Sequence, residues 1–293
     1  MYGKMKKWQL FTEVFTTAML LAACGNGKEA TEASSTASSS ESVTETASSE
    51  DTVIKVASHT TPMTDIVEIA ASVVEEPYTI ELVEVSDNIQ YNEAVFNDEA
   101  DANFAQHEPF MQVFNEERGA DLVAIQPIYN AVVGFYAPEY ETIDDIEDGA
   151  EVAIPSDATN EARALHILDA QGLIDVPDET FVTVDDITSN TKNLTFTSVD
   201  LLNLNAAYQD GVDLVFNYPT YIAEIDLTPA DAIFLEEDDT NRFAVQLVTR
   251  EGNADSEKIQ ALQKAFTSQE VYDFLEELAA KGHLAPAFED PSK

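Results

Sequence analysis

The chain has 293 residues, of which 44% are hydrophobic and 9% aromatic, so it can bury the core of one or two domains and is not a disordered chain. It carries 56 acidic and 14 basic residues, a formal net charge of −42, which excludes nucleic acid as a favourable partner and gives no attraction to anionic lipid. Its one cysteine, Cys24, excludes an internal disulfide and the cysteine-based metal motifs.

Residues 1–23 have the pattern of a signal peptide. Lys4, Lys6 and Lys7 form a basic start, and the apolar stretch from Phe15 to Ala23 that follows is shorter than the ~20 residues needed to span a bilayer. Cleavage after residue 23 leaves 11 basic and 55 acidic residues, a charge of −44. We interpret this acidity as a solvated surface suited to high salt or alkaline pH, with cation binding as the alternative.

The residues around Cys24 predict a lipid anchor. The run LAACG, residues 21–25, resembles the lipobox of bacterial lipoproteins, which implies diacylglycerol on the Cys24 sulfur and a mature chain held on the extracytoplasmic face of the cell membrane. An ordinary signal peptide with an incidental cysteine is the alternative. Residues 24–52 are mostly Ser, Thr, Ala and Glu, a composition that cannot form a core and predicts a flexible tether.

From residue 53 onward, hydrophobic periodicity predicts alternating strands and helices. Strands are predicted at residues 53–57, 78–85, 101–104, 131–136, 151–154, 212–216 and 243–249. Helices are predicted at residues 62–74, 89–96, 109–118, 160–171, 199–210, 256–266 and 269–281. This alternation is typical of an α/β fold with largely parallel sheets, in which ligands lie at the carboxyl ends of the strands.

Four segments, in order, resemble the methionine-binding lipoproteins of ABC importers, the family called MetQ or NlpA. They are VSDNIQYNEA at residues 85–94, EADANFAQHEPF at 99–110, DGAEVAIPSDATNEARAL at 148–165, and SQEVYDF at 268–274 with PAF at 286–288. The resemblance spans residues 53–288, nearly the whole mature domain, and lies behind a lipobox.

The resemblance implies an α/β, two-lobed periplasmic-binding-protein fold, type II-like, with two crossover strands between the lobes. The crossovers are expected near residues 134–137 and 239–243. Lobe 1 would then hold residues 53–135 plus 243–293, and lobe 2 residues 136–242. The implied function is to capture methionine, L or D, or a related amino acid between the lobes for an ABC permease.

Two residues of one predicted helix suit the ligand's carboxylate. The guanidinium of Arg163 matches both carboxylate oxygens, and Asn160, three residues earlier, lies on the same helical face. Asp157 is placed to cap this helix, whose amino end favours an anion. The alternative for Arg163 is a surface ion pair with one of the many acids.

The other predicted ligand contacts lie after strands. Asn217 follows a buried strand, and its amide oxygen could accept from the ligand's ammonium, although an Asx turn before Pro219 is the alternative. The aromatic and imidazole residues Phe104 and His107 suit a thioether, with Gln106 beside them, while core packing and helix capping are the alternatives for the first two. The chain departs from the family at Asn88, Tyr91, Ala105 and 218–221; Tyr91 could replace a lost ring.

Other classes of function are less well supported. The chain has no motif of a catalytic nucleophile or phosphate loop, so we expect a binding protein without catalytic residues or cofactor. Four scattered histidines, His59, His107, His166 and His283, argue against a metal-uptake receptor and predict no metal site. The departures from the family leave open a methionyl dipeptide or another small apolar amino acid as ligand.

Overall fold

The computed structural model describes residues 52–237 and 241–293. The predicted signal peptide (1–23), the lipidation site Cys24 and all of the predicted tether except Thr52 lie outside the described residues. So do residues 238–240, at the start of the predicted return crossover.

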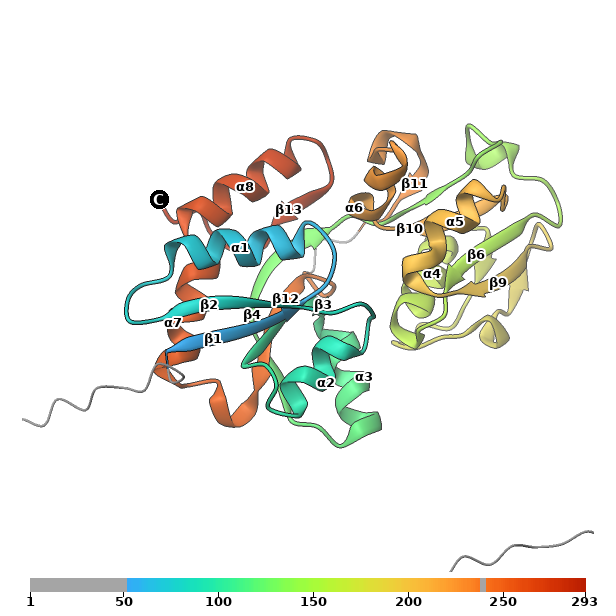
Figure 1. Ribbon diagram of the computed structural model, residues 1–293. Helices are drawn as coiled ribbons and strands as arrows, with labels where there is room; N and C mark the ends of the chain where they lie inside the picture. Colours follow the sequence, from blue (N-terminus) through green and yellow to red (C-terminus); the bar gives the residue numbers. More distant parts are fainter. Residues whose placement is uncertain (1–51, 238–240) are drawn as a thin grey trace, which may run out of the picture. The chain divides into compact units, whose positions relative to one another are not determined.

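The first sheet contains six strands, in the order β13-β4-β12-β3-β1-β2. Their bounds are β1 Val53–Ser58, β2 Thr79–Glu84, β3 Ala102–His107, β4 Leu122–Ala131, β12 Val245–Arg250 and β13 Leu284–Pro286. β1 pairs in parallel with β2 and β3, whereas β12 pairs antiparallel with β3 and β4. Figure 1 shows helices on both faces of this sheet.

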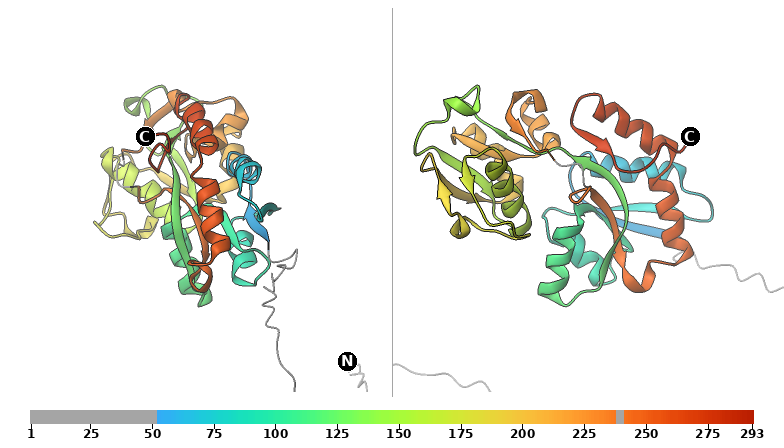
Figure 2. Two further views of the ribbon diagram at one scale, coloured as in Figure 1. Left: turned by 90° about the vertical axis from the view of Figure 1, so that its left-hand side faces the viewer. Right: turned by 180° about the vertical axis from the view of Figure 1, so that it is seen from behind.

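Side-chain alternation along β1 explains these two helical layers. Ile54 and Val56 point to one face and pack in the cluster that includes residues of α1 (Met63–Val73), α7 (Glu257–Phe266) and α8 (Gln269–Ala279). Ala57 points to the other face and packs against α2 (Gln90–Phe96) and α3 (Glu108–Arg118). Both views in Figure 2 show α8 beside α1.

The second sheet contains five strands, in the order β11-β5-β10-β6-β9. Their bounds are β5 Gly134–Tyr136, β6 Glu151–Pro155, β9 Thr195–Val199, β10 Leu214–Asn217 and β11 Ala232–Leu235. Helices α4 (Ala158–Ala170) and α5 (Leu204–Gln209) pack against β6 and β10, and the short α6 (Pro219–Ile222) follows β10. β7 (Ile174–Asp175) and β8 (Ser189–Asn190) form a separate two-stranded antiparallel sheet, in which Ile174 is buried in the core.

The two sheets share one topology, which the sequence did not reveal as a repeat. In the first sheet the first three strands along the chain lie in the order β2-β1-β3. In the second sheet the corresponding strands lie in the order β9-β6-β10, which again puts the second strand at the edge and the first between the other two. The strand that enters from the other sheet, β12 or β5, follows antiparallel, and a fourth strand lies beyond it. The carboxyl ends of β1, β3, β6 and β10 are therefore the positions at which a ligand site is expected.

The chain passes between the sheets twice. It leaves β4 at Ala131 and enters β5 at Gly134, and it returns between β11, which ends at Leu235, and β12, which begins at Val245. A Cβ on Gly134 would lie 2.8 Å from the Phe234 carbonyl oxygen, so only glycine allows β11 to approach this closely.

Several sequence predictions need correction. The sheets are mixed, not largely parallel, because β4, β5, β12 and β13 form antiparallel pairs. The predicted strand at 131–136 is two strands of different sheets, and the helix predicted from residue 199 begins at Leu204, because Val199 ends β9. Strands β4, β7, β8, β9, β11 and β13 were not predicted as such.

Candidate functional site

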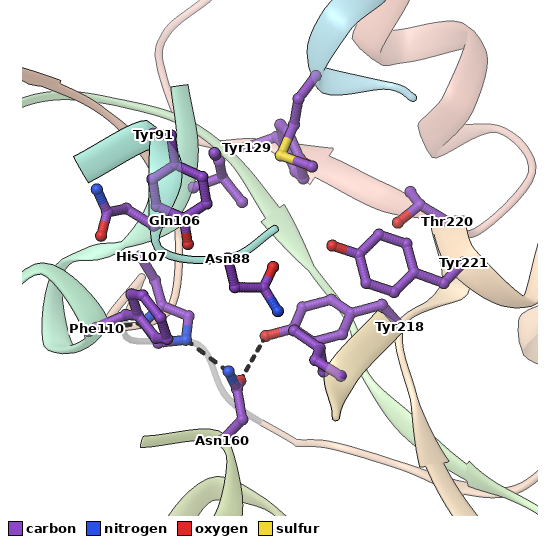
Figure 3. A pocket seen from close by; sticks show the side chains of 14 residues that line it. Asn88, Tyr91, Gln106, His107, Phe110, Tyr129, Asn160, Tyr218, Thr220 and Tyr221 are labelled. Carbon is purple, nitrogen blue, oxygen red and sulfur yellow. Dashed lines mark hydrogen bonds between the residues drawn. The ribbon is translucent and has the colours of Figure 1, made fainter. Parts of the chain in front are cut away.

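Side chains from both sheets enclose a central cavity of about 40 Å³ (Figure 3). From the first sheet and its connections come Met63, Asn88, Tyr91, Ala105, Gln106, His107, Phe110, Tyr129 and Val245. From the second come Asn160, Leu201, Tyr218, Thr220 and Tyr221. Most of these residues lie at or just beyond the carboxyl ends of strands, as the topology predicts.

The lining of the central cavity is aromatic and neutral. Within the described part of the chain, none of its fourteen residues is Asp, Glu, Lys or Arg. Burial raises the pKa of Tyr91, Tyr129 and Tyr221 above the usual value near 10, and raises that of Tyr218 to about 12. These phenols therefore stay protonated at neutral pH and can donate hydrogen bonds to a ligand.

His107 joins the two halves of the cavity. It caps α3, where its Nδ1 accepts from the Phe110 N–H at 3.2 Å, so the neutral ring carries its proton on Nε2. Nε2 lies 3.3 Å from the Asn160 Oδ1 in α4 (Figure 3). Burial, followed by the charge of Arg163, lowers the pKa of His107 to about 3.

Asn160 is held from both sides. Asp157 caps α4, accepting from the Asn160 backbone N–H at 2.9 Å, which confirms the predicted cap, and it also accepts from the Asn160 amide Nδ2. The Asn160 Oδ1 accepts from the Tyr218 hydroxyl at 2.7 Å. Asn160 therefore presents a fixed oxygen to the cavity.

Gln106 lines the cavity, but its amide is already used. Its oxygen accepts from Asn92 Nδ2 at 2.8 Å, and its nitrogen donates to Asn92 and to Asn103 Oδ1. All three side chains are buried. We interpret Gln106 as a residue that fixes β3 against α2.

Arg163 lies outside the central cavity, behind Tyr218. Its side chain is 3% exposed and pairs with Glu236 through Nε and Nη2. Nη2 also donates to the Ala131 carbonyl at 3.1 Å, Nη1 donates to the Tyr218 hydroxyl at 3.1 Å, and the guanidinium lies 4.3 Å from the centre of the Phe243 ring. Burial lowers the pKa of Arg163, but the contacts with Tyr218 and Glu236 outweigh it, so the net pKa is raised.

Two other predicted site residues also lie away from the cavity. Phe104 is fully buried in the core, with its ring 5.2 Å from that of Phe266. The Asn217 side chain turns inward, where Nδ2 donates to Asn205 and Oδ1 accepts from the Tyr218 N–H. The structure thus brings Tyr91, Gln106, His107 and Asn160 together, and leaves Phe104, Arg163 and Asn217 outside.

The site residues predicted from the sequence did not include Met63, Phe110, Tyr129, Leu201, Tyr218, Thr220, Tyr221 and Val245, which also line the cavity. The rule that ligands lie at strand ends did indicate the region after β10. We chose Asn217 there for its amide, whereas the neighbouring Tyr218 is the residue that lines the cavity. Tyr129 lies in β4, a strand that was not predicted.

Because two histidines, His59 and His107, are buried in their neutral form, we expect the protein to lose stability in mild acid. His59, after β1, is 4% exposed; its Nε2 lies 3.5 Å from the Tyr221 hydroxyl, and burial lowers its pKa from 6.5 to about 4 despite contacts with Asn88 and Asp87. The unfolded chain takes up protons near pH 6.5, whereas the folded chain does not until near pH 4. The free energy of unfolding is therefore expected to fall below about pH 6.5, by up to about 1.4 kcal/mol per pH unit for each of His59 and His107.

Urea denaturation between pH 7 and pH 5 measures this slope, in a window above the range where carboxylates titrate. His59→Gln is expected to remove about half of it. A slope equal to that of the wild type in this variant would show that His59 is not buried in its neutral form.

Comparisons with known proteins place the chain in a family. The profile of the NlpA lipoprotein family matches residues 54–288. The chain belongs to the NlpA lipoprotein family. The D-methionine-binding lipoprotein MetQ of Escherichia coli K12, a similar protein, is 34% identical over 214 residues, 71% of this chain and 79% of that protein.

Solved structures of similar proteins support the same assignment. A lipoprotein of the YaeC family from Enterococcus faecalis V583 is 48% identical with a TM-score of 0.73, covering 81% of this chain and 100% of that one. A nutrient binding protein from Burkholderia cenocepacia, solved bound to methionine, is 30% identical with a TM-score of 0.75, covering 80% and 100%. The two-lobed α/β fold predicted for this NlpA lipoprotein is confirmed.

Two further observations concern the described residues of this NlpA lipoprotein. Residues 52–237 and 241–293 contain no helix long and apolar enough to cross a membrane. The same ranges hold no group of three or more His, Cys, Asp or Glu side chains arranged to bind a metal ion.

Proposed function

We propose that this chain is the ligand-capturing subunit of an ABC importer and that it binds methionine, L or D, or a close relative. In this proposal the lipid on Cys24 holds the protein on the extracytoplasmic face of the membrane, where it delivers ligand to a permease. Family membership supports the proposal, as do two similar proteins, one named for binding D-methionine and one solved bound to methionine.

The single observation that carries the proposal is that both sheets contribute side chains to one cavity. Tyr91, Phe110 and Met63 offer the polarisable apolar surface that suits a thioether. The tyrosine hydroxyls offer hydrogen bonds for the polar end of an amino acid. If the Tyr218 hydroxyl turns from Asn160 Oδ1 to the ligand, that oxygen gains a free acceptor position as well. A ligand that contacts both halves favours the arrangement in which they are closed around it.

The size of the cavity indicates that capture involves movement. At about 40 Å³ it has room for about three water molecules, whereas ligand pockets typically measure roughly 300–1,000 Å³. The two lobes, predicted as residues 53–135 plus 243–293 and residues 136–242, are proposed to separate about the two crossovers to admit the ligand. Their first boundary moves to residue 133, because β5 (Gly134–Tyr136) belongs to the second sheet. The permease is proposed to recognise the closed form.

We further propose that the ligand is bound and released without chemical change. Methionyl dipeptides and other small apolar amino acids are the alternative ligands, since the chain departs from its family at Ala105 and Tyr218. A neutral, aromatic lining accepts several apolar side chains, so a ligand panel is needed to decide between them.

A thermal-shift assay tests the proposal. Methionine at about 100 times its dissociation constant is expected to raise the Tm by about 5–10 °C, because binding to the folded state alone adds about 2.7 kcal/mol. Asn160→Ala is expected to abolish the shift, since it removes the oxygen between Tyr218 and His107. Asn97→Ala, at the exposed end of α2, serves as the matched control and should keep it.

If methionine does not shift the Tm of the wild type but a dipeptide or another amino acid does, that compound and not methionine is the ligand. A full shift in Asn160→Ala would place the ligand elsewhere.

A further inference from the structure

Tyr218 stands between the central cavity and the buried positive charge of Arg163. Tyr218 lines the cavity, and Arg163 does not. The Tyr218 hydroxyl accepts from Arg163 Nη1 at 3.1 Å and donates to Asn160 Oδ1 at 2.7 Å (Figure 3 shows the second bond). The Tyr218 hydroxyl therefore links Arg163, which lies outside the cavity, by hydrogen bonds to Asn160 in the lining.

The ring of Tyr218 is fixed on several sides. It is 8% exposed, it meets the Phe216 ring edge-on at 5.8 Å, and it lies 5.4 Å from the Tyr221 ring. Its backbone N–H donates to Asn217 Oδ1 at 2.8 Å, and Pro219 begins α6 directly after it. These contacts fix the position of the Tyr218 ring in the lining.

The guanidinium of Arg163 has little capacity left for a ligand. Its Nε–H and one Nη2–H go to Glu236, the other Nη2–H goes to the Ala131 carbonyl, and one Nη1–H goes to Tyr218. The pair of N–H donors that could bind a ligand's carboxylate is thus already bound to the carboxylate of Glu236.

We infer that Tyr218 is a specificity-determining residue whose hydroxyl, and not the Arg163 guanidinium, contacts the ligand's carboxylate. This inference rests on the proposed function. The hydroxyl turns its proton from Asn160 Oδ1 to the carboxylate, while Asn160 keeps the Nε2–H of His107 as a donor. Arg163, which donates to the same phenol oxygen, makes its O–H a stronger donor.

A cycle of two changes tests the contact, one in the protein and one in the ligand. Tyr218→Phe keeps the ring and removes the hydroxyl. Binding is measured for methionine and for 3-(methylthio)propylamine, which is methionine without its carboxylate. Tyr218→Phe is expected to weaken methionine on the order of 10–100-fold, the range for a lost hydrogen bond to a charged group. The affinity for the amine should stay within about 3-fold of the wild-type value, because the amine has no carboxylate for the hydroxyl to contact. A structural defect, by contrast, would weaken the binding of both ligands.

Tyr208→Phe, on α5 outside the cavity, is the matched control and should change neither affinity. Unchanged or tighter methionine binding in Tyr218→Phe would overturn the inference alone, because the hydroxyl would then contribute nothing to methionine affinity. Equal weakening of both ligands would also overturn it. No methionine binding by the wild type would overturn the proposed function as well.

Discussion

Arg163→Ala is expected to lower the free energy of unfolding by about 3–5 kcal/mol, one of the largest effects of any single substitution in this chain. The substitution leaves the Glu236 carboxylate, whose side chain is 11% exposed, without its cationic partner. It also removes the donor to the Ala131 carbonyl and the cation above the Phe243 ring. Urea denaturation at pH 7 measures the loss.

Two controls separate this buried pair from an ordinary ion pair. Lys264→Ala breaks the exposed pair with Glu75, whose side chains are 68% and 67% exposed, and should cost less than about 1 kcal/mol. The double variant Arg163→Met with Glu236→Leu should be more stable than Arg163→Ala, because no unpaired charge remains buried. A single-variant cost below about 1 kcal/mol would contradict the buried pairing.

Phe104→Ala is expected to cost about 3–5 kcal/mol and to leave methionine affinity nearly unchanged. The Phe104 ring is fully buried, packing edge-on against Phe266 at 5.2 Å and Tyr129 at 6.0 Å, so its removal leaves a cavity in the core. Denaturation measures the stability, and calorimetry at a temperature where the variant stays folded measures the affinity.

The matched control is Phe181→Ala, since Phe181 is 45% exposed and its loss should cost less than about 0.5 kcal/mol. A methionine affinity lowered more than about 10-fold in Phe104→Ala would instead support the sequence prediction that Phe104 contacts the ligand.

The sequence predicted the first lobe well where periodicity was strong. The strand and helix pattern from residue 53 to 118 matches β1 through α3 closely, because each element alternates or repeats with its own period. β4 was missed because Pro127, with the half-buried polar residues Gln126 and Asn130, breaks its pattern, and proline argues against a strand interior. The antiparallel entry of β12 and β5 depends on the path between sheets, which local pattern does not encode.

The candidate site was predicted in part. Asn160 was predicted because it lies one helical turn before Arg163 at a helix start, and His107 because its segment resembles the family and an imidazole suits a thioether; both line the cavity. The partner of Arg163, Glu236, lies 73 residues away in an acidic run that composition assigns to the solvated surface. Which residue after β10 reaches the cavity depends on tertiary packing, so Asn217 was chosen where Tyr218 lines the cavity.

Calorimetric titration of the mature protein with methionine shows whether this chain captures a small amino acid between its two lobes. We expect saturable heat with about one methionine per chain, and loss of that heat in Asn160→Ala. A flat titration with the wild type, in protein whose folding is verified by its denaturation curve, would mean that the chain does not capture methionine.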